Sequence, residues 1–277
     1  MNFKMMTYVY DGTFDGFLTV VFEIYASKRK PVQIVRERMW QAGFFETPAL
    51  IVTDVAKSER VWNGIVAKSN KKVTRMFYLA FASELPDVEM TLYCYLEKLF
   101  ADVTKTFHKN ILDDHSFDLY QISRKVSFEI HRFQGFVRFQ ETSEGLLFAA
   151  IEPDHDILSL LAPHFVRRFG SQNWVIYDQR RDKGVLYQKP ELLEITLTNK
   201  QLNTITGEIL HSIQSEDENL YRSLWKAYYK AINIPERKNT RLMLRLLPRR
   251  YWKYLPEKQS NVADKNEPEN FLKKIVQ

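Results

Sequence analysis

The spacing of the apolar residues changes once along the chain, and this change constrains the fold more than any other feature. Between about residues 14 and 135, apolar side chains recur every three or four positions, as in helices that bury one face. Between residues 136 and 198, they stand in short runs bounded by turn residues, which is typical of strands. We therefore expect an α+β protein in which a helical block packs beside a small antiparallel sheet, closed by C-terminal helices.

The first half of the chain is expected to be mostly helical. The apolar residues of 14–27 fall on one helical face, and Thr13 or Asp11 precedes them as a cap. A strand is expected at 3–10, where it would join the sheet, and 31–52 look irregular between two prolines. Further helices are expected at about 54–69, 71–83, 86–108 and 116–134, with Val103 buried on the third of these and Gly135 ending the fourth.

The second half should supply the sheet and the closing helices. Strands are expected at 136–142 and 145–153, and a hairpin over 173–189 with its turn near Asp182–Gly184. Residues 155–169 should form a helix that is interrupted or kinked near Pro163, and 192–197 are either a strand or the start of a helix. Helices are expected at 216–233 and 239–247, and Pro248 divides the second of these from the sequence RRYWKYLPE.

These elements are expected to form a single α+β domain over residues 1–258. It comprises the helical block (about 14–135), a sheet-containing part (about 136–198), and the C-terminal helices with a basic segment (199–258). The polar residues 259–277 should be a flexible tail.

The single cysteine, Cys94, limits the chemistry of the chain. One cysteine cannot form a disulfide within the chain, and it cannot build a cysteine-only metal or iron–sulfur site. It lies in an apolar helical stretch, where a buried and inert thiol is expected. No secretory signal and no run of 18 apolar residues is present, so we expect a cytoplasmic protein with no membrane span and no cofactor of its own.

Residues 236–258 hold the positive excess of the whole protein. They carry eight basic and two acidic side chains, an excess of six that equals the formal net charge of +6. Tyr251, Trp252 and Tyr254 lie among these cations. Guanidinium groups bind phosphates and flat rings stack on bases, so the mixture suits a nucleic-acid strand. The alternative is a solvated amphipathic helix followed by an aromatic anchor packed on the core.

Titratable side chains gather between residues 131 and 181. The candidates for acid–base chemistry are His131, His155, His164 and Asp178, together with Asp11 in the turn DGTFDG. A straight helix would place His155 and His164 on opposite faces, which argues against one shared metal ion. Structural histidines, an Asp11 cap, and ion pairs of Arg138, Arg168, Arg180 and Arg181 with Asp154, Asp156 and Asp178 are the structural alternatives.

Several standard catalytic motifs are absent from the sequence. It contains no Gly-x-Ser-x-Gly, no His-Glu-x-x-His and no Gly-x-Gly-x-x-Gly. The turn DGTFDG is neither a P-loop nor an EF-hand loop, because it has no Gly-Lys-Ser/Thr and no terminal glutamate. These absences argue against a standard serine hydrolase, zinc protease or dinucleotide enzyme.

Four motifs together resemble a known bacterial family. They are YVYDGTFDGFLTVVFEIY, HRFQGFVRF, the stretch from PDHDILSLLAPHFVRRF to NWVIYDQRR, and IPERKNTRLMLRLLPRRYWKYLPE. The chain is similar over about residues 7–257 to the family labelled "probable DNA metabolism protein". The resemblance implies a gene beside that of a radical-SAM protein or, in other bacteria, fusion to a uracil-DNA-glycosylase-like domain. It implies a role in DNA repair or base modification, and any radical-SAM cluster would belong to the partner.

The resemblance carries over no catalytic residue, and three hypotheses follow. The first is a DNA-binding accessory protein that acts with a radical-SAM or uracil-DNA-glycosylase-like partner. The second is an enzyme that acts on DNA through the region of His131, His155, His164 and Asp178. The third is a protein-interaction subunit anchored by its C-terminal aromatic residues. The expected DNA contacts are Arg138, Arg168, Arg180, Arg181, Arg237, Arg241, Arg245, Arg249, Arg250, Tyr251, Trp252 and Lys253.

Overall fold

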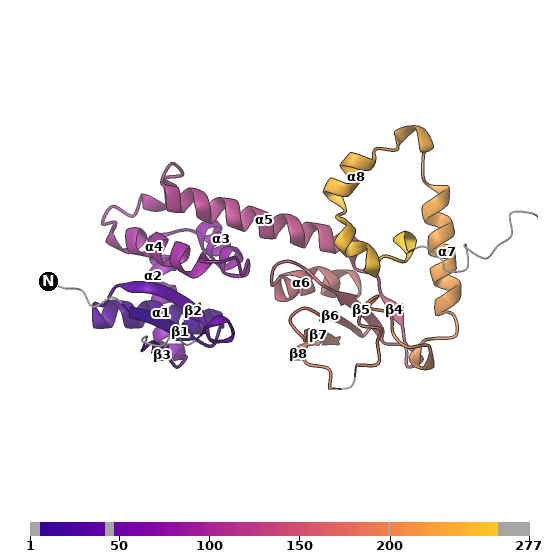
Figure 1. Ribbon diagram of the computed structural model, residues 1–277, viewed down its shortest axis with the longest axis horizontal. Coiled ribbons are helices and arrows are strands. Elements are labelled where there is room, and N and C mark those ends of the chain that lie inside the picture. Colours follow the sequence, from indigo (N-terminus) through magenta and orange to yellow (C-terminus); the bar gives the residue numbers. More distant parts are fainter. Residues whose placement is uncertain (1–5, 42–46, 199, 260–277) are drawn as a thin grey trace, which may run out of the picture. The chain divides into compact units, whose positions relative to one another are not determined.

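The computed structural model describes residues 6–41, 47–198 and 200–259, and it confirms the expected α+β class (Figure 1). Contacts divide the chain into two compact units. The first unit comprises Met1–Glu129 and Asp154–Asp156, and the second comprises Ile130–Pro153 and Ile157–Gln277. The expectation of a single domain over 1–258 stays a prediction.

A three-stranded parallel sheet lies in the first unit. Its strands are β1 (Met6–Tyr10), β2 (Pro31–Arg36) and β3 (Ala49–Ile51), in the order β2–β1–β3. Two expectations are therefore wrong: the stretch expected to be irregular contains strands β2 and β3, and β1 does not join the sheet formed later in the chain. Pro31 is compatible with β2 because it is the first residue of an edge strand, where a proline costs no central ladder bond.

Helix α1 (Phe14–Ser27) follows β1 and has the bounds that its apolar spacing predicts. Thr13 caps it, and the Thr13 hydroxyl accepts a hydrogen bond from the Gly16 amide. Asp11 accepts hydrogen bonds from Thr13 and Thr53, which shapes the turn ahead of the helix. Position 16 needs glycine, because a Cβ atom there would lie 2.2 Å from Asp11 Oδ1.

Three more helices complete the fold of this unit up to residue 101. They are α2 (Val55–Lys68), α3 (Lys71–Phe81) and α4 (Val88–Ala101), and Asp54 and Asn70 cap the first two. Helix α4 ends before the predicted residue 108 because Asp102 accepts hydrogen bonds from the amides of Thr104, Thr106 and Phe107. Val103, which was expected to be buried, is 90 % exposed. A short 3-10 helix, η2, follows at Phe107–Lys109.

Helix α5 (Asp114–Phe136) continues through Gly135, where the sequence pattern predicts its end. Its last aromatic residues, Phe133 and Phe136, pack against the ring of Tyr251. This packing outweighs the low helix propensity of one glycine. The strand predicted at 136–142 is correspondingly short, and only Gln140–Glu141 pair as β4.

A five-stranded sheet lies in the second unit, in the order β4–β5–β6–β7–β8. The remaining strands are β5 (Leu147–Ile151), β6 (Trp174–Asp178), β7 (Lys183–Gln188) and β8 (Glu191–Ile195). The pair β5–β6 is parallel because α6 (Leu158–Arg168) crosses between these strands, while the other pairs are antiparallel as expected. The hairpin is confirmed, but its turn precedes Gly184, which lies within β7 opposite Tyr177.

The predicted C-terminal helices are confirmed as α7 (Glu218–Ala231) and α8 (Thr240–Leu246). Short 3-10 helices lie around them: η3 (His211–Ile213), η4 (Pro235–Arg237), η5 (Arg249–Tyr254) and η6 (Pro256–Lys258). Residues 3–5 of the expected N-terminal strand and 260–277 of the expected tail lie outside the described residues. No helix in the described parts of the chain combines the length and apolarity needed to cross a membrane.

Cys94 lies half-buried in α4 as a free thiol. Burial raises the pKa of this thiol, and nearby Glu97 raises it further. The thiolate is therefore disfavoured, as expected for an inert cysteine.

Candidate nucleic-acid interface

Four arginines recur every fourth residue along the segment that contains α8. They are Arg237, Arg241, Arg245 and Arg249, which we call the arginine row. All four are exposed, and none pairs with a carboxylate of the described residues within 4.0 Å. In Figure 1 the segment leaves α7, turns into α8 and continues into η5. The row thus presents uncompensated positive charge.

Local structure and one distant side chain hold the arginine row in place. The Asn239 side chain caps α8 by accepting a hydrogen bond from the Leu242 amide at 2.9 Å. Arg132 of α5 donates to the carbonyl oxygen of Arg245 at 3.1 Å, which brings a fifth cation to the segment. Arg132 is missing from the expected DNA contacts because no sequence pattern shows that α5 and α8 meet.

The aromatic residues after Pro248 fix the segment to the second unit. Tyr251 is 2 % exposed, and its ring centroid lies 5.0 Å from that of Phe133. The Tyr254 hydroxyl donates to Glu152 at 2.8 Å, and Trp252 Nε1 donates to the Leu247 carbonyl at 3.1 Å. Tyr251 therefore has no open face on which a base could stack. It is an aromatic anchor packed on the core, as the alternative to nucleic-acid binding expected.

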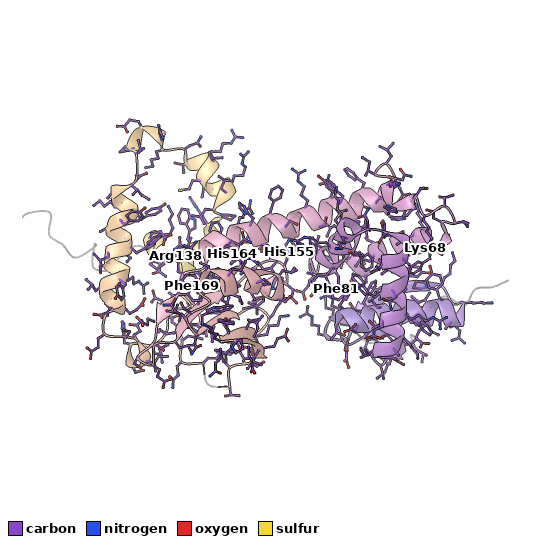
Figure 2. The ribbon with its side chains drawn as sticks, turned by 180° about the vertical axis from the view of Figure 1, so that it is seen from behind. Lys68, Phe81, Arg138, His155, His164 and Phe169 are labelled. Atoms are coloured by element: carbon purple, nitrogen blue, oxygen red, sulfur yellow. The ribbon has the colours of Figure 1, made fainter. Side chains whose placement is uncertain are left out.

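Arg138, shown in Figure 2, takes part in a compact cluster with Glu257 and Trp225. Its Nη2 donates to Glu257 Oε1 at 2.8 Å, and its guanidinium carbon lies 4.9 Å from the Trp225 ring centroid. Trp225 Nε1 donates to the other carboxylate oxygen at 2.9 Å. Burial works to raise the pKa of Glu257, but the hydrogen bonds from Arg138 and Trp225 hold it below its usual value. These contacts give Arg138 a structural role.

Arg181 and Asp178 form a buried ion pair at 2.7 Å where β6 ends. Asp178 also accepts hydrogen bonds from the amides of Arg180 and Arg181, so it shapes the hairpin turn. Burial raises the pKa of Asp178, although Arg181 opposes this shift. Asp178 and Arg181 thus form an ion pair, which was the structural alternative to a role in catalysis or DNA binding.

The other side chains expected to contact DNA differ in whether they already bind a partner within the protein. Lys253 forms an ion pair with Glu152, and Arg250 donates to the Tyr251 hydroxyl at 2.9 Å. Arg168 is exposed at the end of α6, with its guanidinium carbon 5.7 Å from the Phe169 ring centroid. Arg168 therefore remains available, whereas Lys253 already has a carboxylate partner.

The candidate catalytic residues have separate surroundings. His155 belongs to the first unit, where its Nδ1 lies 2.8 Å from the Ser83 carbonyl oxygen and its amide donates to Glu129. Asp11 also lies in that unit, and although burial works to raise its pKa, its hydrogen bonds with Thr53 and Thr13 lower it. The other candidates, His131, His164 and Asp178, belong to the second unit.

Within the second unit, the two histidine candidates differ in exposure. His131 is exposed on α5, whereas His164 Nε2 is buried in α6 without a hydrogen-bond partner among the described residues. Burial, Arg167 and Arg168 lower the pKa of His164. In the described parts of the chain, no three His, Cys, Asp or Glu side chains are placed to hold a metal ion.

Comparison with known proteins gives a match to a family model. Residues 86–257 match a family model described as a domain of unknown function (DUF4130), which covers more than half of the chain. No curated protein and no solved structure matches the chain.

Proposed function

The chain belongs to the DUF4130 family of domains of unknown function, and we propose that it is a DNA-binding accessory protein in DNA repair or base modification. The exposed arginine row, with no carboxylate partner among the described residues, carries this proposal. The resemblance of the sequence motifs to a DNA-metabolism family supports the choice of DNA as the polyanion. The chemistry would come from a radical-SAM or uracil-DNA-glycosylase-like partner.

The spacing of the row suits a phosphate backbone. Arg241 and Arg245 are four residues apart in α8, a rise of about 6 Å along the helix axis. Two phosphate steps of one DNA strand advance by about 7 Å along a duplex axis. Guanidinium groups bind phosphate oxygens through two parallel hydrogen bonds, so neighbouring members of the row can hold every second phosphate of one strand.

Helix α7 supplies the second surface that an accessory protein needs. Leu220, Leu224, Tyr228 and Ile232, which we call the α7 stripe, recur every fourth residue and are each more than half exposed. Large contiguous patches of exposed apolar side chains are rare on the surfaces of monomeric proteins, and they commonly mark protein-binding sites. The α7 stripe supports a protein-interaction role, with the partner enzyme as its occupant.

Fluorescence anisotropy with labelled single-stranded and duplex DNA across a salt series tests the DNA proposal. We expect salt-sensitive binding, and Arg241→Gln/Arg245→Gln should weaken it at least tenfold at low salt. The slope of log K against log salt should become shallower by about 2, because each lost phosphate contact removes about 0.9. Because both arginine side chains are exposed, we expect this variant to fold normally.

The matched control is Lys71→Gln/Lys72→Gln, which removes the same charge from exposed positions of the first unit. It should bind DNA like the unmodified protein. Absence of DNA binding at low salt, or unchanged binding by the Arg241/Arg245 variant, would contradict the proposal.

A further inference from the structure

A pocket of ≈ 280 Å³ in the second unit lies against one face of α7. Glu218, Tyr221, Arg222 and Trp225 line it, and their spacing of i, i+3, i+4 and i+7 places them on the same side of the helix. Arg138 and Tyr254 line it from other parts of the chain. The pocket therefore combines aromatic rings, guanidinium groups and two carboxyl groups, of which Glu208 is paired with Arg222.

Glu218 is the carboxyl group with unused hydrogen-bonding capacity. Its side chain is largely buried, with the residue 8 % exposed, and Oε2 accepts a hydrogen bond from the Glu141 amide at 2.8 Å. Oε1 accepts no hydrogen bond from the described residues, and no cation of these residues forms an ion pair with Glu218. Burial raises the pKa of this carboxyl group, although the hydrogen bond from the Glu141 amide and the positive charge of Arg222 oppose the shift.

Arg222 offers donors next to this acceptor. Its Nη2 donates to Glu208 and to Gln259, while Nε and Nη1 have no hydrogen-bond partner among the described residues. Its charge is largely balanced by Glu208, so it serves a ligand as a hydrogen-bond donor more than as a free cation.

The aromatic side chains supply faces for a planar ligand. Trp225 is held in orientation by Glu257 and by the guanidinium of Arg138. Tyr221 is 54 % exposed at the same wall, and its ring has no aromatic neighbour among the described residues. Rings of this kind stack on nucleobases whatever their hydrogen-bonding edge.

We propose that this pocket binds a nucleobase of the guanine type, with the base stacked on the aromatic wall, Glu218 accepting its N1–H and N2–H groups, and Arg222 donating to its O6. Guanine is the nucleobase that presents one carbonyl acceptor beside two adjacent donors. A carboxylate can accept both donors, as it accepts both N–H groups of an arginine. Adenine and cytosine each place a ring acceptor beside their amino group, which an ionised carboxylate repels. Thymine offers a single ring donor.

This inference goes beyond the DNA-binding proposal. It can be tested with a free nucleotide, whose binding to the pocket does not require the arginine row. Calorimetric titration of the full chain with dGMP, dAMP, dCMP and dTMP is the experiment. We expect dGMP to bind at least tenfold more tightly than dAMP, since adenine keeps an amino donor but has no ring N–H, so one charge-assisted hydrogen bond is lost.

Glu218→Gln should abolish the preference for dGMP while keeping a carbonyl oxygen for the Glu141 amide. Glu216→Gln, an exposed position before the helix, is the matched control and should keep the preference. Tyr221→Ala, which removes an exposed ring and should leave the fold intact by circular dichroism, should weaken all four nucleotides.

Three results would overturn the inference: no dGMP binding at millimolar concentration, equal affinity for the four nucleotides, or a preference for dGMP that survives in Glu218→Gln. The arginine row is not needed in any of these measurements. If the chain binds dGMP but not DNA, only the DNA proposal is refuted. If it binds DNA but not dGMP, only the proposal of guanine binding in the pocket is refuted.

Discussion

Glu257 joins two side chains from distant parts of the chain. It accepts hydrogen bonds from Arg138, just after α5, and from Trp225 of α7. Its side chain is only 3 % exposed, so the negative charge is stabilised by these donors and not by water. The pKa of Glu257 is accordingly lower in the folded protein than the ordinary value of 4.5.

Glu257→Gln should destabilise the fold in a pH-dependent way. The lowered pKa means that the contribution of Glu257 is fully present above about pH 4.5 and is lost as the pH falls through the folded-state pKa. At pH 7 we expect a loss of about 2 kcal/mol in the free energy of unfolding, because two hydrogen bonds to a charged group are weakened. Urea unfolding at pH 7 and at decreasing pH measures the difference.

The difference in the free energy of unfolding between the unmodified protein and Glu257→Gln should become smaller as the pH falls. Glu236→Gln, an exposed acid outside this cluster, is the control and should leave the free energy of unfolding unchanged within about 0.5 kcal/mol. An equal loss for Glu257→Gln at every pH would show that the charge of Glu257 has no part in the effect.

Helix α7 has a reversed distribution of polarity. Its partly buried positions include Arg222, Lys226 and Tyr229, while the α7 stripe of Leu220, Leu224, Tyr228 and Ile232 is exposed. A helix packed on the core of its own unit normally buries the apolar side. The arrangement fits a helix whose apolar side is covered by another protein.

Leu220→Glu/Leu224→Glu should leave stability unchanged within about 0.5 kcal/mol, because both side chains are exposed. If the α7 stripe binds the proposed radical-SAM partner, the same substitutions should weaken that complex at least tenfold, since each places a charge in an apolar interface. Ile205→Glu, an exposed apolar position outside α7, is the control. Tm and co-purification with the partner are the measurements, and an undiminished complex would contradict a role for the α7 stripe.

Elements with local signals are predictable from the sequence. Helix α1 has a one-sided apolar pattern and a capping Thr13, and α8 has a capping Asn239 before it and Pro248 after it. Strands β2 and β3 are not predictable in this way, because their partner β1 is distant in sequence and each is short. The passage of α5 through Gly135 likewise depends on Tyr251, more than a hundred residues away.

The whole molecule concentrates its excess of positive charge in one segment. The arginine row was predictable because charge density can be counted along a sequence. The pocket was not, because its lining comes from residues as far apart as Arg138, Glu208 and Gln259. The family match begins at residue 86, so β1 and helices α1 to α3 lie outside it, whereas both the row and the pocket lining up to residue 257 lie within it.

Retention on heparin should depend on where the charge lies and not on its total. Replacing the four arginines of the row with Gln lowers the formal net charge from +6 to +2, and we expect much earlier elution in a salt gradient. Replacing Lys71, Lys72, Arg75 and Lys105, all exposed in the first unit, gives the same net charge and should leave elution nearly unchanged. Equal shifts in both variants would show that only net charge matters.

The contact between Arg138 and Glu257 also has a practical consequence for shortened versions of the protein. Glu257 is the last residue of the family match, and its partner lies 119 positions earlier in the chain. A C-terminal truncation that removes Glu257 would strip the ion pair from a half-buried guanidinium and the hydrogen bond from the Trp225 indole. Any fragment designed for expression or crystallisation should therefore extend past this glutamate, even where the aim is only to study the sheet.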